Sequence, residues 1–196
     1  MVAAKQEETM SRDAILARIR RHRPAEAALP DIHAPAFITY QDRYAQFATL
    51  IAGLGGHALT LAPGQTVREA VDTHWPAQGR VVDTTQAIHD EAASPHDWAD
   101  VDIAIVPGQL AVAENAAVWV SQDALAYRSL YFLAQRLVMV VPRDALVDTM
   151  RDAYARVGFA EHGFGSFISG SSRTADIEQS LVMGAHGAMA ALVVFE

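Results

Sequence analysis

The stretch from Phe167 to Gln179 contains the residues whose types and spacing are best suited to chemistry. It reads F-I-S-G-S-S-R-T-A-D-I-E-Q, an apolar strand end followed by a turn of small residues and then by a short predicted helix. Gly170, Ser171 and Ser172 allow the backbone to approach a ligand closely. Because backbone N–H groups at the start of a helix can hold an anion, the stretch predicts an anion-binding site.

The side chains after this turn would complete such a site. The Ser172 and Thr174 hydroxyls could donate to the anion, Arg173 could clamp a carboxylate or phosphate in a bidentate contact, and Asp176 or Glu178 could orient Arg173. The same spacing also fits ordinary helix capping, which serves the helix alone. Ligands of open α/β sheets bind outside the carboxyl ends of the strands, so we expect the turn to lie at that edge.

Glu114 is a second candidate, because it follows the apolar run Ala111–Ala113. A carboxylate buried there would be desolvated, which suits a general acid, a general base or a nucleophile. The pair Glu114-Asn115 also resembles the start of the Glu-Asn-Gly run of CoA-transferases, whose glutamate forms an acyl intermediate. In the alternative interpretation, the Glu114 side chain faces solvent or pairs with an arginine.

His186 stands between Gly184 and Gly187, where its ring could act as an acid, a base or a ligand, or could be purely structural. His89 and His96 are accompanied by the acids Asp90, Glu91, Asp97 and Asp100. Their spacing is not that of a compact metal motif, so we predict no metal site. The sequence contains no Ser nucleophile elbow, Walker A loop or dinucleotide fingerprint, so we also predict no NAD, FAD or other cofactor.

Composition narrows the possible classes of protein. The chain has 196 residues, a net charge of −8 and no cysteine. Without cysteine it cannot carry a disulfide scaffold, a thiol nucleophile or a Cys-ligated metal cluster. The acidic balance argues against nucleic-acid binding. The apolar runs are shorter than the ~18–20 residues that span a membrane, and the polar N-terminus lacks the apolar core of a signal peptide. We therefore expect a cytoplasmic protein with no nucleic-acid or membrane partner.

The chain is predicted to divide into residues 1–36, a tail with a helix and a Pro-rich connector, and residues 37–196, an α/β domain. Ser11 can cap a helix that starts at Arg12. Apolar Ile15, Leu16 and Ile19 lie on one face of that helix, and arginines crowd its C-terminal end. These features suit either a patch that binds an anion or a partner, or a solvated helix end.

Residues 37–196 alternate between strand and helix patterns, which predicts an open, mostly parallel sheet flanked by helices. Predicted strands or apolar segments are His57–Ala62, Val81–Val82, Val101–Val106, Ala111–Val120, Leu137–Val141 and Leu192–Phe195. Predicted helices carry the stripe Tyr40, Tyr44, Phe47 and Ile51, the capping box Thr66-Val67-Arg68-Glu69, and the series Leu146, Met150, Tyr154 and Val157.

Several of these stretches together resemble one family. Ile168–Gly187 reads I-S-G-S-S-R-T-A-D-I-E-Q-S-L-V-M-G-A-H-G, similar to the C-terminal signature I-S-G-P-S-R-T-A-D-I-E and L-V-x-G-x-H-G-P of the lactate-utilisation protein C family, also called the LUD domain. Ser11–Arg20 resembles its N-terminal helix, Asp102–Ala116 its central A-I-A-E-T-G-T stretch, and Val140–Pro142 its V-V-P. The resemblance extends from about residue 11 to 196.

The resemblance implies a fold like the NagB/RpiA/CoA-transferase group. It also implies a non-iron–sulfur subunit or regulator in the oxidation of L-lactate to pyruvate, beside partner subunits that carry iron–sulfur clusters. The expected ligand is a small anion such as lactate, pyruvate or a phosphate, bound at Gly170–Asp176 with Glu114, His186 and Gly187 facing the pocket.

This chain departs from the family pattern in ways that imply a divergent member. Ser171 and Ala188 replace prolines, Asn115-Ala116-Ala117 replaces T-G-T, and Val106-Pro107-Gly108 replaces T-G-A. Two other functions remain open. One is an autonomous enzyme of the same fold group, acting on CoA esters, sugar phosphates or folates through Glu114. The other is an interaction module that docks a partner, or a second copy of the chain in a homo-oligomer, through residues 12–36.

Overall fold

Strands rich in valine, isoleucine and leucine build the main sheet. The computed structural model describes residues 11–28, 37–85, 94–125, 127–158, 163–175 and 181–196. Within them the main sheet contains β1 (Gly56–Thr60), β2 (Arg80–Asp83), β3 (Val101–Pro107), β6 (Arg136–Val141) and β11 (Ala190–Phe195). Their order is β1-β11-β6-β3-β2, and all neighbours are parallel. The near-continuous apolar runs of β3, β6 and β11 are typical of strands buried on both faces. The predicted α/β class is confirmed.

A second sheet was not predicted. It contains β4 (Leu110–Val112), β5 (Ala117–Ser121), β7 (Leu146–Val147) and β8 (Gly165–Ile168), in the order β7-β4-β5-β8. The apolar segment predicted over Ala111–Val120 forms two strands, because the turn at Glu114-Asn115 folds it into the antiparallel pair of β4 and β5. Ala116 follows this turn with φ of 53°, a left-handed conformation that glycine adopts most readily. That conformation explains the glycine of the family's T-G-T.

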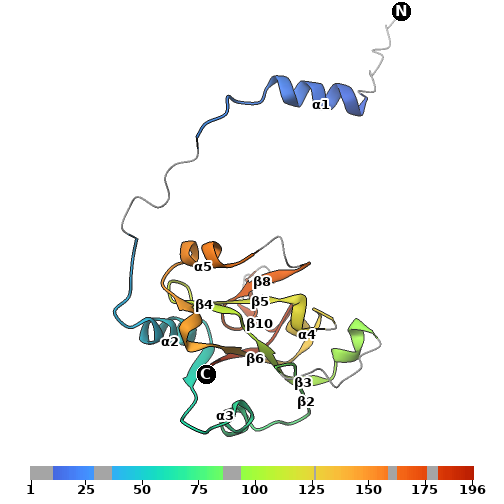
Figure 1. Ribbon diagram of the computed structural model, residues 1–196. Helices are drawn as coiled ribbons and strands as arrows, with labels where there is room; N and C mark the ends of the chain where they lie inside the picture. Colours follow the sequence, from blue (N-terminus) through green and yellow to red (C-terminus); the bar gives the residue numbers. More distant parts are fainter. Residues whose placement is uncertain (1–10, 29–36, 86–93, 126, 159–162, 176–180) are drawn as a thin grey trace, which may run out of the picture. The chain divides into compact units, whose positions relative to one another are not determined.

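The two sheets stack, and helices cover their outer faces (Figure 1). Helix α3 (Val67–His74) packs Val71 on one face of the main sheet. The other face packs against the second sheet and against Phe47 and Ile51 of α2 (Arg43–Gly53). Helix α5 (Met150–Arg156) packs Ala153 on the outer face of the second sheet. The short helix α4 (Leu130–Leu133) adds Leu130 and Tyr131 to the core between the sheets.

The helix boundaries follow from capping side chains. The predicted capping box is confirmed: the Thr66 hydroxyl accepts from the Glu69 N–H, and the Glu69 carboxylate accepts from the Thr66 N–H. Helix α2 begins after its cap Asp42, so Tyr40 lies before the helix and not in it as predicted. The predicted helix with Leu146 starts later than expected, because Leu146 pairs in β7. A second capping box holds the start of α5.

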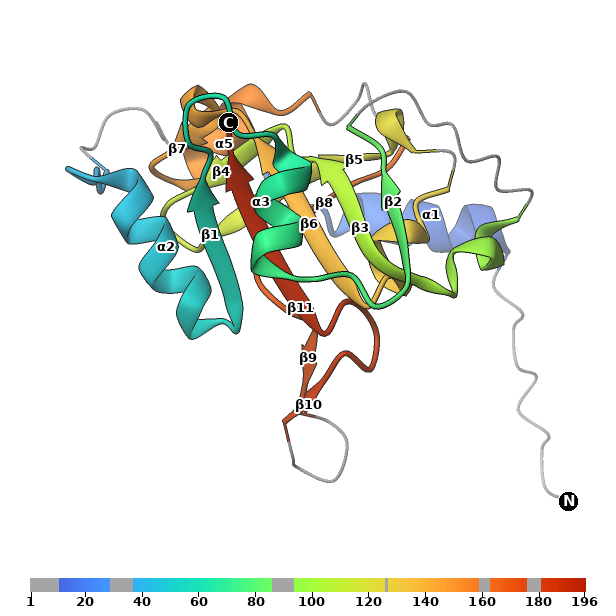
Figure 2. The same ribbon diagram turned by 90° about the horizontal axis from the view of Figure 1, so that it is seen from below.

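The short helix predicted after Gly170–Ser172 is wrong. Residues Arg173–Thr174 form β9, which pairs antiparallel with β10 (Val182–Met183). Figure 2 shows this hairpin beyond the starting ends of the parallel strands. The Met189 N–H, just before β11, donates to the carbonyl of Gln135, just before β6. The turn therefore lies at the amino ends of β6 and β11, opposite to the carboxyl edge that we expected.

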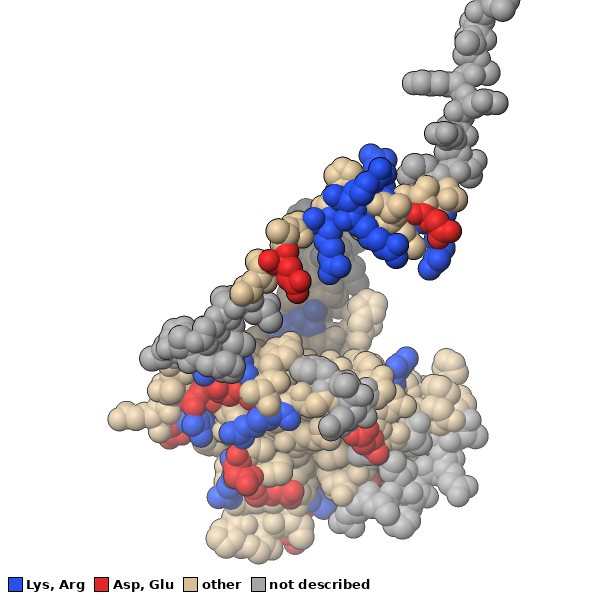
Figure 3. Space-filling view, turned by 45° about the horizontal axis from the view of Figure 1, so that its top comes forward, with Lys and Arg blue, Asp and Glu red and all other residues tan. Residues whose placement is uncertain are grey.

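Residues 1–36 form a unit separate from residues 37–196. Its described part contains α1 (Arg12–Arg21), capped by the Ser11 hydroxyl as predicted. None of the helix's residues is buried, and Ile15 and Ile19 are exposed. Arg18, Arg20 and Arg21 lie in the last turn, and the arginine side chains gather over the helix in Figure 3.

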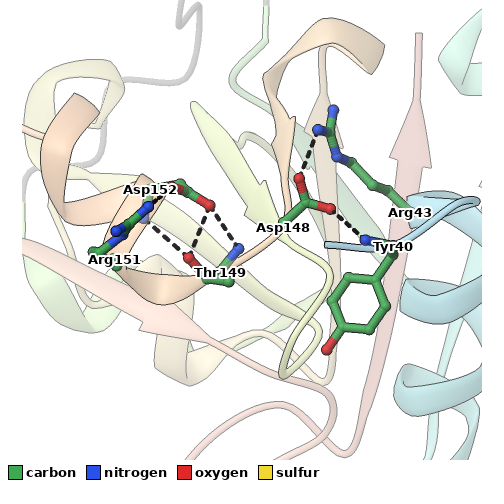
Figure 4. Close-up of polar contacts among 6 residues, drawn as sticks. All are labelled: Tyr40, Arg43, Asp148, Thr149, Arg151 and Asp152. Atoms are coloured by element: carbon green, nitrogen blue, oxygen red, sulfur yellow. Dashed lines mark hydrogen bonds and ion pairs between the residues drawn. The ribbon is translucent and has the colours of Figure 1, made fainter. Parts of the chain in front are cut away.

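Asp148 joins α2 to the segment between β7 and α5 (Figure 4). Its carboxylate is only 8% exposed, accepts the Tyr40 N–H at 2.9 Å and pairs with the Arg43 guanidinium at 2.6 Å. The hydrogen bond from Arg43 is the main cause that lowers the pKa of Asp148, against the opposing effect of burial. The start of α2 therefore depends on a buried carboxylate that must be ionised.

Replacing Asp148 with Asn should lower the free energy of unfolding by about 1–3 kcal/mol, the typical loss when a charged hydrogen bond is removed. Because the folded-state pKa of Asp148 is lowered, its contribution is complete above the unfolded-state value of about 3.9 and is lost as pH falls through the folded-state value. Urea unfolding of D148N should therefore depend less on pH below about 4 than unfolding of the wild type. The exposed Asp144→Asn serves as the control, and equal losses in the two variants would contradict the account.

Candidate functional site

A cavity of about 240 Å³ opens between β8, α4 and the segment before β11. It is lined by Tyr131, Phe132, Leu137, Ser166, Phe167, Ile168, Ser169, Gly170, Ser171, Ser172, His186, Gly187 and Ala188. The turn from the C-terminal signature thus meets the His-Gly pair that follows it in the chain. The cavity is smaller than the roughly 300–1,000 Å³ of pockets for drug-sized ligands, which suits a small molecule.

Contacts on both sides hold the turn in place. The Ser171 hydroxyl donates to the Leu54 carbonyl at the end of α2. Gly170 has φ of 71°, and a Cβ there would lie 2.8 Å from the Leu54 oxygen. On the other side, the Ser172 N–H donates to the Ala188 carbonyl at 2.9 Å. Only glycine fits at position 170 without moving the end of α2.

Hydrogen-bond donors of the turn are left without partners. Among the described residues, nothing accepts from the N–H groups of Gly170, Ser171 or Gly187 or from the Ser172 hydroxyl. Gly170 and Ser171 are themselves buried residues. Since buried backbone N–H groups are almost always paired, these donors indicate a place for an acceptor such as a ligand oxygen.

The rest of the lining is mostly apolar and carries little charge. Phe132, Leu137, Phe167 and Ile168 supply apolar walls, and Tyr131 donates its hydroxyl to the Ser121 carbonyl instead of to the cavity. Of the described lining residues, His186 is the one with a basic side chain. Its exposed ring has no hydrogen-bond partner in the described part of the chain. The lining suits a small group with one negative charge better than a dianion.

Other predicted ligand residues lie away from the cavity. Arg173 is exposed, and its guanidinium lies 3.5 Å from the Gly53 carbonyl at the end of α2. Thr174 is paired in β9 with Val182. Asp176 is outside the described residues, as are Glu178 and the His89–Glu91 part of the metal candidate.

Glu114 is exposed, so the expectation of a desolvated carboxylate is wrong. Its carboxylate accepts the Met150 N–H at 2.8 Å, at the first residue of α5. The β4–β5 turn still lies next to the cavity, because the Ser169 hydroxyl donates to the Asn115 carbonyl at 2.7 Å. Glu114 thus caps a helix on one side of this turn, while Ser169 lines the cavity on the other.

The described residues contain neither a candidate metal cluster nor a candidate membrane span. No group of three or more His, Asp or Glu side chains there could hold a metal ion. In the same part of the chain, no helix is long and apolar enough to cross a membrane.

Comparison with protein families identifies the domain. The model of the LUD domain matches residues 72–195, which include every strand of the two sheets except β1 and every described residue of the cavity. The chain belongs to the LUD domain family. The resemblance seen in the Ile168–Gly187 signature is therefore confirmed.

The curated relatives of this LUD domain protein carry the name "Lactate utilization protein C". The protein of Geobacillus thermodenitrificans is 28% identical over 127 residues, which are 61% of this chain and 52% of that protein. The protein of Shouchella clausii is 33% identical over 98 residues, 47% of this chain and 43% of that protein. This chain thus spans about half the length of the curated relatives it matches.

A solved structure supports the fold alone. The crystal structure of a DUF162 family protein from Deinococcus radiodurans aligns with a TM-score of 0.56 and 15% sequence identity. The alignment covers 78% of this chain and 95% of that chain.

Some lining residues had no signal in the sequence. Tyr131 and Phe132 belong to α4, a four-residue helix that is too short to show a periodic pattern. Ser166 belongs to β8, whose place in a second sheet depends on its pairing with β5. The adjacent aromatic pair Tyr131-Phe132 could have indicated an apolar wall, but it does not indicate where in the fold that wall lies.

Replacing Gly170 with Ala should lower the free energy of unfolding by about 2–4 kcal/mol, because the new Cβ is strained by φ and would also overlap Leu54. Gly64→Ala is a matched control, since Gly64 also has positive φ (79°) but no atom lies within 4 Å of a Cβ there. That control should cost about 1 kcal/mol in urea unfolding. If the two variants lost equal stability, the tight contact between Gly170 and Leu54 would be refuted.

Proposed function

We propose that this LUD domain protein binds a small carboxylate, such as lactate or pyruvate, in the cavity between β8 and the segment before β11. The carboxylate oxygens would accept from the N–H groups of Gly170, Ser171 and Gly187 and from the Ser172 hydroxyl. His186 at the exposed side would add a donor, or a positive charge when protonated. The apolar walls would contact the carbon atoms of the ligand.

The observation that carries this proposal is the group of unpaired donors in the buried turn. A carboxylate accepts several hydrogen bonds at once, and bonds to a charged acceptor are stronger than neutral ones. Phosphate fits less well, because no Lys or Arg is found among the described lining residues to balance its second charge.

We propose that in the cell the protein takes part in lactate utilisation, as a subunit or regulator without its own iron–sulfur cluster. The name of the curated relatives and the absence of cysteine support this role. Iron–sulfur subunits as partners and a cytoplasmic location belong to the same proposal.

The second candidate, an interaction module, is favoured by the exposed Ile15 and Ile19 on the basic helix α1 and stays a prediction. The autonomous enzyme using Glu114 also stays a prediction, although the capping contact with Met150 gives that carboxylate a structural role.

Isothermal titration calorimetry of the full chain tests the proposal. Pyruvate and L-lactate should bind more tightly than inorganic phosphate. Ser172→Ala should raise the Kd for pyruvate about tenfold or more, since a hydrogen bond to a charged group contributes about 1.5–3 kcal/mol.

Ser94→Ala is the control, because the Ser94 hydroxyl accepts from the His96 N–H outside the cavity. Its Kd should equal that of the wild type. The absence of binding by both carboxylates, or an unchanged Kd in Ser172→Ala, would refute the proposed site.

A further inference from the structure

Arg128 belongs to a cluster of side chains that begins at Phe132 in the cavity wall, and the proposed function does not use Arg128. Its guanidinium carbon lies 5.1 Å from the ring centroid of Phe164, over the ring. The Phe164 ring in turn meets the Phe132 ring edge-to-face, with centroids 6.4 Å apart. Because Phe132 lines the cavity, the cluster continues from the cavity wall to a guanidinium.

The contacts with Phe164 place Arg128 and Phe132 on the same side, because the Arg128 guanidinium and the Phe132 ring both contact that ring. The Tyr131 N–H donates to the Arg128 carbonyl and the Phe132 N–H to the Ser129 carbonyl, so hydrogen-bonded turns lead from Arg128 into α4. Phe164 is the residue just before β8. Its carbonyl accepts the Gln122 N–H, which fixes its backbone there.

The surface of the cluster is available to a ligand. Phe132 is 42% exposed, although it is a large apolar side chain. Arg128 is exposed, and none of the described carboxylates pairs with it. The stacking contact with Phe164 restrains the guanidinium without using its hydrogen-bond donors.

We propose that the ligand of this site is longer than lactate: an acid whose planar body crosses Phe132 and whose second anionic group binds Arg128. This inference rests on the proposed function, which places the first carboxylate at Gly170–Ser172. The exposed Phe132 ring would contact the planar body, and the five N–H donors of Arg128 would bind a carboxylate or phosphate at its far end. The sequence predicted Arg173 as the cation that binds an anionic group. In this arrangement Arg128 makes that contact instead.

Three probes separate the parts of this inference in calorimetric titrations of the full chain. Pyruvate has the acid head alone, phenylpyruvate adds a planar body, and 4-carboxyphenylpyruvate adds a distal carboxylate. We expect phenylpyruvate to bind more tightly than pyruvate, and 4-carboxyphenylpyruvate to bind about tenfold more tightly again. Arg128→Gln should abolish the second gain and leave the Kd for phenylpyruvate unchanged.

Arg68→Gln is the matched control, since Arg68 pairs with Asp72 on the surface of α3, on the other side of the main sheet. It should keep both gains. Arg128→Lys should keep part of the second gain, because it retains the charge but not the planar stack on Phe164.

Binding of pyruvate and phenylpyruvate with no advantage for the distal carboxylate would overturn the role of Arg128 and leave the proposed function intact. An advantage that survives in Arg128→Gln would overturn it equally. If none of the three probes binds, both the proposed function and this inference fail.

Discussion

The contact between the Gly170 backbone and Leu54 is the constraint on which the site depends. It brings the end of β8 against the end of α2, at a separation that a Cβ would not allow. On its other side, the turn is hydrogen-bonded to Ala188, just before β11. The turn therefore bridges the second sheet and the main sheet beside the cavity, and several of its donors have no partner among the described residues. In our proposal, the affinity of the turn for a hydrogen-bond acceptor follows from this packing requirement.

The ion pairs that fix β3 and α2 lie outside the cavity, whose described lining carries little charge. Asp102 at the start of β3 accepts from the Gln78 and Gly79 N–H groups and pairs with Arg136, which lowers the pKa of Asp102. In a similar way, the Asp148 carboxylate accepts the Tyr40 N–H and pairs with Arg43 at the start of α2. The backbone N–H donors of the turn are themselves neutral, and a hydrogen bond is electrostatically stronger inside a protein than in water.

Strands buried on both faces could be predicted from their apolar runs, and the capping box at Thr66 from its spacing. The position of the site could not. The rule that places ligands at carboxyl ends describes doubly wound sheets, whereas here the Gly170–Ser172 turn, the segment before β11 and β8 of the second sheet line a pocket at the amino ends. The helix expected after Ser172 failed for the same reason, since pairing of Thr174 with Val182 overrides a local capping pattern. Glu114 was misjudged because apolar neighbours in sequence do not bury a residue that occupies a turn.

The central claim is that the unpaired donors of the Gly170–Ser172 turn and of Gly187 receive a small carboxylate. Its most direct measurement is a titration of the ¹⁵N-labelled full chain with pyruvate, followed by amide chemical shifts. The account predicts that the Gly170, Ser171 and Gly187 amides move most, in the downfield direction expected for new hydrogen bonds. Shifts concentrated instead at the carboxyl ends of the parallel strands, near Thr84 and Gly108, would contradict it.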